Sequence, residues 1–144
     1  MRSKAGKYVI EFSPLILICI LIWPAIYNGY PLVYSDTGTY ISSGFSGVVP
    51  VDRPIIYGWF VRYMSLSHSL WFVLLAQAVT VFFEIYMVAR RFISGNTVFI
   101  AMLITCILSF TTGLSNYTSQ IMPDIFSALS IMGFAVILTA ERMR

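Results

Sequence analysis

Charge is scarce in this sequence. Of its 144 residues, 10% are Asp, Glu, Lys or Arg, whereas soluble globular domains carry roughly 25%. Hydrophobic residues make up 58% of the chain, and repeats, low-complexity runs and flexible linkers are absent. This balance excludes a soluble domain of useful size and indicates a membrane protein. The net charge of +3 comes from basic residues that signal membrane topology, so it gives no indication of nucleic acid binding.

Cysteine is also rare, with only Cys19 and Cys106 in the chain. Both fall inside long apolar stretches, where a free cysteine behaves as a small buried hydrophobe. The sequence offers neither of them partners for a disulfide or a metal site. We therefore expect both side chains to be buried, and we assign no metal-ligating residue.

Long apolar stretches dominate what is there. About 20 apolar residues in a helix cross the hydrocarbon core of a bilayer, and four stretches reach or approach that length. Helix is the expected backbone, because unpaired peptide groups are costly in lipid. The sequence therefore predicts an all-α integral membrane protein, a single module over residues 1–144, with four transmembrane helices at about 9–27, 69–89, 97–114 and 124–140.

Basic residues predict the orientation of these helices. Cytoplasmic loops are enriched in Lys and Arg. Seven of the nine such residues flank one set of helix ends: Arg2, Lys4, Lys7, Arg90, Arg91, Arg142 and Arg144. We therefore expect both termini and the 90–96 loop in the cytoplasm. The N-terminus lacks a small-x-small cleavage pattern, so we interpret it as an uncleaved signal anchor.

The three aspartates of the chain lie in the two loops that this topology puts outside. Asp36 and Asp52 fall between the first and second apolar stretches, and Asp124 falls between the third and fourth. Ionisable groups at a membrane surface often bind or react with something that arrives there. These residues are therefore the first candidates for a functional site.

The first outer loop carries a further pattern. Asp36 stands among hydroxyl residues and is followed by Gly38, which would allow a close backbone approach. Pro54 suits the first turn of a helix. Apolar residues then recur at spacings of three and four, which predicts a short amphipathic helix over about 54–63 on the outer surface. Its apolar stripe consists of Ile55, Ile56, Trp59, Phe60 and Tyr63.

Four motifs in this order resemble the N-terminal part of GT-C glycosyltransferases, such as protein O-mannosyltransferases and bacterial aminoarabinose transferases. They are the early acidic Asp36, Arg53-Pro54-Ile55-Ile56-Tyr57 before the second span, Ala89-Arg90-Arg91-Phe92 at its end, and Pro123-Asp124-Ile125-Phe126 opening the fourth. The resemblance covers all 144 residues but only the front of such enzymes. It implies a piece of a longer GT-C domain in a bacterial cytoplasmic (inner) membrane, inactive as an isolated fragment.

The resemblance also implies a reaction. Such enzymes transfer a sugar from a polyprenyl-phosphate donor to a lipid, glycan or protein acceptor on the non-cytoplasmic face. Asp36 would be the general base, and Asp124 would orient the acceptor or hold Asp36 and an arginine in place. Arg53 and Arg62 would bind the phosphate. Two departures matter, because Arg53 replaces a commoner histidine, and the lone Asp36 leaves open a divalent cation as cofactor.

Structural roles stand beside these functional ones. Asp36 also fits a turn cap, Asp124 a helix cap, and Arg62 a side chain that reaches lipid headgroups. Tyr40 and Tyr57 are candidates for binding sugar or polyprenyl, although aromatic residues near a bilayer surface commonly form an interfacial belt. A different class of protein also fits the sequence: a small polytopic membrane protein without catalysis, such as a transporter or assembly subunit.

Overall fold

The computed structural model describes residues 15–93 and 95–141. Within these ranges the regular structure is helical, apart from one isolated β-bridge between Leu32 and Gln120. The prediction of an all-α chain is therefore confirmed. Part of the first predicted span and the basic residues near both termini lie outside the described residues.

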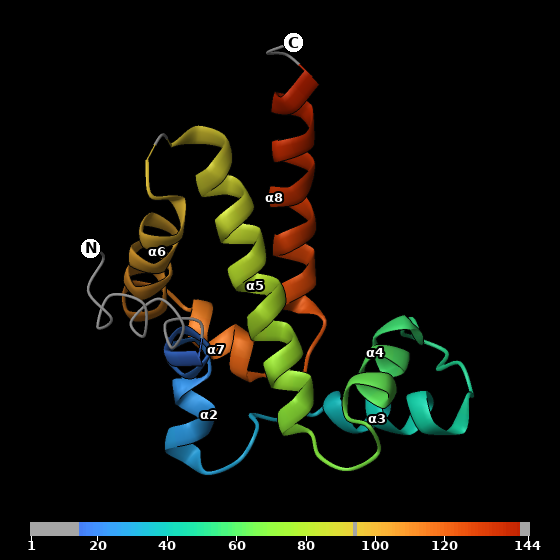
Figure 1. Cartoon of the computed structure of the whole chain (residues 1–144). Coiled ribbons are helices and arrows are strands. Elements are labelled where there is room, and N and C mark those ends of the chain that lie inside the picture. Colours follow the sequence, from blue (N-terminus) through green and yellow to red (C-terminus); the bar gives the residue numbers. More distant parts are fainter. Residues whose placement is uncertain (1–14, 94, 142–144) are drawn as a thin grey trace.

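The helices follow one another with short connections. Residues 15–21 are helical, and the helices after them are α2 (Trp23–Asn28), α3 (Thr37–Ser46), α4 (Ile56–Met64), α5 (Trp71–Phe92), α6 (Thr97–Thr111), α7 (Leu114–Ser119) and α8 (Asp124–Glu141). In Figure 1, α6 and α8 flank the long helix α5, and α3 and α4 form a separate pair beside its first turns. Helix α7 packs against α2, α5, α6 and α8.

Helix α5 is the one described helix that is both long and apolar enough to cross a membrane. Its 22 residues span about 33 Å at 1.5 Å per residue. Helix α6 has 15 residues and ends where Thr112 adopts an extended backbone, so the third predicted span stops short of residue 114. Helix α8 keeps its predicted start, at Asp124. Both α6 and α8 are apolar but shorter than α5.

The first predicted span is interrupted. The helix over residues 15–21 breaks at Ile22, which is the N-cap of α2, and Pro24 follows in the first turn of α2. Proline suits a helix start because its nitrogen has no hydrogen to leave unpaired. Cys19, in this helix, is exposed, and Cys106 is half-buried. The prediction that both cysteines are buried was therefore wrong, since the surface around Cys19 faces away from the described core.

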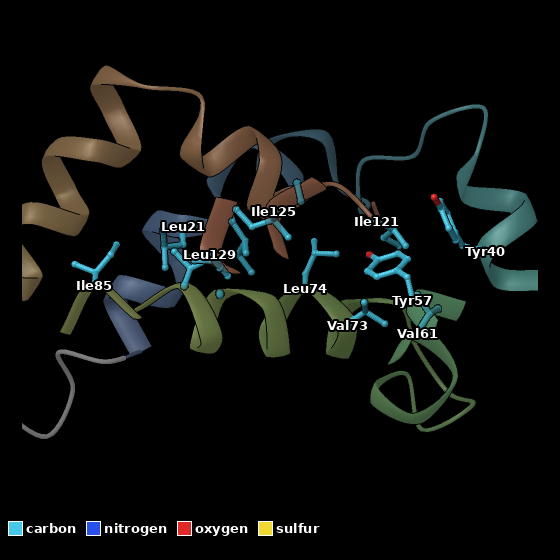
Figure 2. Packing of buried hydrophobic residues seen from close by; sticks show 14 of the residues in the cluster. Leu21, Tyr40, Tyr57, Val61, Val73, Leu74, Ile85, Ile121, Ile125 and Leu129 are labelled. Atoms are coloured by element: carbon cyan, nitrogen blue, oxygen red, sulfur yellow. The ribbon is translucent and has the colours of Figure 1, made fainter. Parts of the chain in front are cut away.

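The hydrophobic core follows one side of α5. Buried residues recur along it at helical spacing: Val73, Leu74, Gln77, Ala78, Val81, Ile85 and Ala89. Against this side pack Leu21 and Ala25 from the N-terminal helices, Ala101 from α6, and Ile125 and Leu129 from α8. Figure 2 shows the row of side chains, with Ile85 near one end and Tyr57 and Tyr40 at the other. The core thus ends among aromatic residues of α3 and α4.

Helices α3 and α4 are joined by a backbone contact between two glycines. A Cβ atom on Gly44 would overlap the carbonyl of Gly58, and one on Gly58 would lie 2.7 Å from the Tyr40 carbonyl oxygen and 2.8 Å from the Gly44 nitrogen. Gly38 has open space around it. The expectation that Gly38 permits a close approach was therefore wrong, because the approach occurs one to two turns later along α3.

Helix α4 confirms the predicted short helix but shows which face packs. Tyr57, Gly58 and Val61 are buried against the rest of the protein. Ile56, Trp59 and Tyr63 of the predicted apolar stripe point outward and are well exposed. The glycine contact explains this choice, because α4 can approach α3 closely only on the side that carries Gly58. The outward face remains apolar.

We expect Gly58→Ala to destabilise the protein by about 1–3 kcal/mol, the range for an extra methyl group forced into a packed interior. Gly38→Ala is the matched control in the same pair of helices, and it should be neutral or slightly stabilising because alanine favours helix. Thermal unfolding of the purified protein in detergent would compare them. Equal midpoints for the two variants would contradict the assigned glycine contact.

Candidate functional site

Asp36 lies directly before α3 and is its N-cap residue. Its backbone carbonyl accepts hydrogen bonds from the Thr39 and Tyr40 amides. Its side chain makes no capping hydrogen bond, so the carboxylate is available for other partners. One is Ser35, whose hydroxyl donates to Asp36 Oδ1 at 3.0 Å. The structure thus disfavours the helix-capping role for this carboxylate.

Arg53 is the second partner of Asp36. Its Nη1 lies 2.5 Å from Asp36 Oδ2, and its Nε donates to Asp52 Oδ2 at 3.1 Å. The guanidinium carbon lies 5.9 Å from the centre of the Tyr40 ring, within the range of a cation–π contact. The side chains of Arg53 and Asp36 are 23% and 36% exposed, so solvent reaches the pair, although the Nη1 atom of Arg53 is itself buried. Two carboxylates and a ring therefore surround one guanidinium.

This pairing changes the protonation equilibria of the site. The hydrogen bond from Arg53, with a smaller contribution from Ser35, lowers the pKa of Asp36 below its usual value. The Asp36 carboxylate in turn raises the pKa of Arg53. Both groups are therefore charged at neutral pH. A carboxylate with a lowered pKa is a weak base, so the paired Asp36 is poorly suited to accept a proton.

Tyr40 and Tyr57 connect the ion pair to the core. Their rings meet edge to face with centres 5.2 Å apart. Tyr57 also stacks on Phe60 at 5.8 Å. Burial raises the pKa of the Tyr57 phenol well above its usual value, with smaller contributions from Tyr40 and Asp124. Tyr57 is therefore a neutral hydrogen-bond donor, and its hydroxyl donates to Gln77 Oε1 at 2.8 Å.

Gln77 joins the segment between α2 and α5 to the segment between α6 and α8 through one buried amide. Its side chain is fully buried in α5. Besides accepting from Tyr57, it donates from Nε2 to the carbonyl oxygens of Thr118 and Gln120 at 3.0 and 2.9 Å. Tyr57 belongs to α4, and the two carbonyls belong to the segment between α6 and α8. Every hydrogen-bonding group of this amide is thus used to hold the two segments together.

Backbone contacts strengthen the same junction. The Leu32 amide donates to the Ser119 carbonyl at 2.9 Å, and the Ile121 amide donates to the Leu32 carbonyl at 3.0 Å. The buried Thr37 hydroxyl, one residue after Asp36, donates to the Ile121 carbonyl at 3.1 Å. The start of α3 is therefore fixed to the segment that leads into α8.

An apolar groove lies between α4 and α8 beside the ion pair. Its volume is about 370 Å³. The lining residues come from two segments: Pro54, Ile56, Tyr57 and Phe60 on one side, and Pro123, Phe126, Ser127 and Ser130 on the other. Arg53 is not among the lining residues, but two features connect it to the groove: Pro54 is the next residue in the chain, and Tyr57 contacts the Tyr40 ring that lies against the guanidinium. The groove has the apolar lining that an apolar chain would need.

Asp124 faces a different hollow. It is the first residue of α8 and is exposed. With Tyr34, Asn116 and Gln120 it lines a hollow of about 340 Å³. Tyr34 stands two residues before Asp36, so the hollow borders the loop that carries the ion pair. That Asp36 and Asp124 serve one substrate stays a prediction.

Arg62 lies apart from Arg53, in the last turn of α4. Its Nη1 donates to the Gly44 carbonyl at 3.3 Å, next to the glycine contact of α3 and α4. This bond gives Arg62 a structural role. Of the six residues predicted for the site, the structure gathers Asp36, Arg53, Tyr40 and Tyr57. No metal-binding group of three or more His, Cys, Asp or Glu residues occurs in residues 15–93 and 95–141.

Comparisons with known proteins identify no relative. No protein-family model, no curated protein and no solved structure matches the chain.

The hydrogen bond between Tyr57 and Gln77 predicts the direction in which mutations change the stability of the protein. Gln77→Leu should destabilise the protein by at least about 1–3 kcal/mol, because it leaves buried polar groups unpaired. Tyr57→Phe alone should cost about 1 kcal/mol. In the Gln77→Leu background, the same change should be neutral or stabilising, because it removes a hydroxyl that has lost its acceptor.

Thermal unfolding of the four proteins of this double-mutant cycle would measure the coupling. Thr80→Ala is the control on α5, because its exposed hydroxyl bonds only within its own helix. Strict additivity of the two site mutations would show that the Tyr57–Gln77 bond is absent in the protein.

Proposed function

We propose that this chain carries the outer-face site of a multi-pass membrane glycosyltransferase that takes its sugar from a polyprenyl-phosphate donor. One observation carries the proposal: a carboxylate–arginine–tyrosine cluster adjoins an apolar groove through Tyr57, which lines the groove and contacts Tyr40. A lipid phosphate needs such a combination, because its chain must be buried while its phosphate is paired with cations. The resemblance of the four sequence motifs to GT-C enzymes supports the same function.

The distribution of apolar surface supports membrane insertion of more than α5. Large apolar side chains stand exposed along two shorter helices: Phe99, Leu103, Ile107 and Phe110 on α6, and Ile131, Phe134, Ile137 and Leu138 on α8. Exposed apolar surface of this extent marks contact with lipid or other helices. A helix as short as α6, about 22 Å long, is accommodated by local thinning of the bilayer.

The ends of α5 support the predicted orientation. Asp36 directly precedes α3, Asp52 lies between α3 and α4, and Asp124 is the first residue of α8. The α3–α4 pair lies beside the first turns of α5, and α8 begins beside its middle and runs toward the other end of α5 (Figure 1). Arg90 and Arg91 are in the last turn of α5, at that other end. Acidic residues at one end and basic residues at the other are expected for an outer and a cytoplasmic side.

We expect a cysteine at Ser42, on the exposed side of α3, to react with an impermeant maleimide from outside intact cells. A cysteine at Phe92, at the other end of α5, should react only after the membrane is opened. Cys19 and Cys106 must first be replaced by alanine, since Cys19 is exposed. Labelling of both sites from one side would contradict a membrane-spanning α5.

The geometry suits a single displacement at the sugar. The acceptor hydroxyl oxygen attacks the anomeric carbon and loses its proton to Asp36. The bond between that carbon and the phosphate oxygen breaks, and its electron pair leaves with the lipid phosphate, whose charge Arg53 stabilises. Tyr40 lies against the guanidinium of Arg53, and Tyr57 supports the Tyr40 ring and lines the groove. In this proposal Asp124 contacts the acceptor from the adjoining hollow.

In the full-length protein, Asp36→Asn should reduce transfer from a radiolabelled polyprenyl-phosphate sugar by at least about 10²-fold, the contribution of a general base. Asp52→Asn should have a much smaller effect, because Asp52 contacts only the outer edge of Arg53. Membrane preparations with matched protein levels would be compared. Near-native transfer by the Asp36→Asn protein would exclude Asp36 as the base.

One observation favours the non-catalytic alternative. Asp36 and Arg53 are paired with each other, so neither is free for the role assigned to it in transfer. A subunit that uses this pair only to join α3 to α4 would show the same contact. The two classes differ in whether a phosphate ligand can open the pair.

A further inference from the structure

The ion pair blocks two groups at once. A phosphate oxygen and Asp36 Oδ2 would compete for the same Nη1 of Arg53, which lies 2.5 Å from that carboxylate oxygen. Asp36 meanwhile has a lowered pKa because of that same bond. Its strength as a base and the availability of Arg53 are therefore linked: whatever takes Arg53 away from Asp36 also makes Asp36 a stronger base.

We propose that the Asp36–Arg53 pair is a latch that a phosphate ester opens. The phosphate takes the Nη edge of Arg53 and releases the Asp36 carboxylate toward the acceptor side. This inference rests on the proposed function and adds to it an order of events: the phosphate ligand binds first, and the base becomes competent only afterwards. The latch keeps the base weak while the donor site is empty.

The surroundings of Arg53 allow one carboxylate to leave while the guanidinium stays in place. Asp52 holds Nε at 3.1 Å, on a different edge from the one that Asp36 occupies. The Tyr40 ring contacts the face of the guanidinium, and Tyr40 itself is buried. Losing Asp36 therefore leaves Arg53 with two of its three contacts and exposes its Nη atoms to a ligand.

The geometry of the contact favours the exchange. A phosphate ester carries at least one negative charge, as a carboxylate does, and it can bind a guanidinium through two oxygens, whereas Asp36 contacts Nη1 of Arg53 through Oδ2 alone. The pair is accessible, with 36% of the Asp36 side chain exposed, so the released carboxylate can be solvated. Ser35 remains as its hydrogen-bond partner. A nearby phosphate and Asp52 are both negative, so the pKa of the released Asp36 rises.

A purely structural pair would behave differently. If the contact served only to fasten α3 to α4, removing Asp36 would loosen Arg53 and weaken any phosphate binding. A latch predicts the reverse, because Asp36 competes with the ligand. The sign of the effect on affinity therefore separates the two, and it does so without any measurement of sugar transfer.

The experiment measures binding to the full chain in nanodiscs of zwitterionic lipid. The probes are a polyprenyl monophosphate, the uncharged polyprenol, and inorganic phosphate in solution. Asp36→Asn should tighten binding of the monophosphate lipid by at least about tenfold, equivalent to one lost competing contact. Asp52→Asn, which removes the same charge from the same arginine, should tighten it much less. Arg53→Gln should weaken it, and the polyprenol should be insensitive to all three changes.

The arms also separate sources of the phosphate. If Asp36→Asn tightens binding of the monophosphate lipid while inorganic phosphate binds little, the groove contributes to affinity and the ligand is a membrane lipid. Equal gains for both probes point to a soluble phosphate ester and would refute the polyprenyl donor while leaving the latch intact. Unchanged or weaker binding of both probes by the Asp36→Asn protein overturns the latch.

A second measurement uses the native protein, so it does not depend on a variant that folds. The chain contains three aspartates, so labelling of the aspartate carboxyl carbons with ¹³C gives three signals, which Asp52→Asn and Asp124→Asn proteins assign. Without ligand, the Asp36 carboxyl should titrate below the usual range. With the monophosphate lipid bound, its pKa should rise. If the pKa of Asp36 stays low at saturating ligand, the latch is refuted. If the pKa rises as expected but the full-length protein transfers no sugar, only the proposed reaction is refuted.

Discussion

The side-chain amide of Gln77 is the interaction on which the site depends. It is buried in α5 and satisfies a tyrosine hydroxyl from α4 and two carbonyls from the segment between α6 and α8. A buried amide is costly unless all its groups are paired, so the two segments cannot separate without exposing or stranding it. Through Tyr57 and the edge of Tyr40, this constraint reaches the guanidinium of Arg53. The cluster is therefore positioned by the core of the molecule.

The two kinds of polar interaction in the site have different mobility. The Gln77 junction is inaccessible to solvent, and its partners are backbone or buried side-chain groups, so it forms a fixed frame. The Asp36–Arg53 pair is partly exposed, and exposed ion pairs contribute little to stability. The Gln77 junction fixes the surrounding segments, whereas the Asp36–Arg53 pair can exchange. This combination suits a site where a ligand replaces one partner of an ion pair. A pair buried as deeply as Gln77 could not exchange in this way.

Long apolar stretches made the central helices predictable from sequence. Helix α5 and the start of α8 follow from uninterrupted apolar residues and from Pro123 before Asp124. Helix α3 was not predicted, because Thr37–Ser46 is rich in glycine and hydroxyl residues and has no apolar periodicity. It is stabilised by the backbone contact of Gly44 with Gly58, a tertiary feature without a local sequence signal.

Tertiary contacts also limited the prediction of the site. Asp36 and Arg53 were each identified by residue type and topology, yet their pairing across 17 positions depends on how α3 and α4 pack. Gln77 was recognisable as a polar residue in an apolar stretch, which predicts a partner. Its actual partners, in segments on both sides in sequence, could not be identified. Pattern thus revealed the chemical groups, and packing decided which of them meet.

Gln77 also has a consequence for biogenesis. Its donors pair with carbonyls 41 and 43 residues further along the chain, whereas its acceptor pairs with Tyr57, which is synthesised earlier. When α5 leaves the ribosome, the carbonyl partners of the Gln77 Nε2 donors have therefore not yet been synthesised. The Nε2 donors of Gln77 stay without these partners until the segment between α6 and α8 has been synthesised and has packed against α5. The Gln77 junction therefore cannot be completed before the chain has been synthesised as far as Gln120.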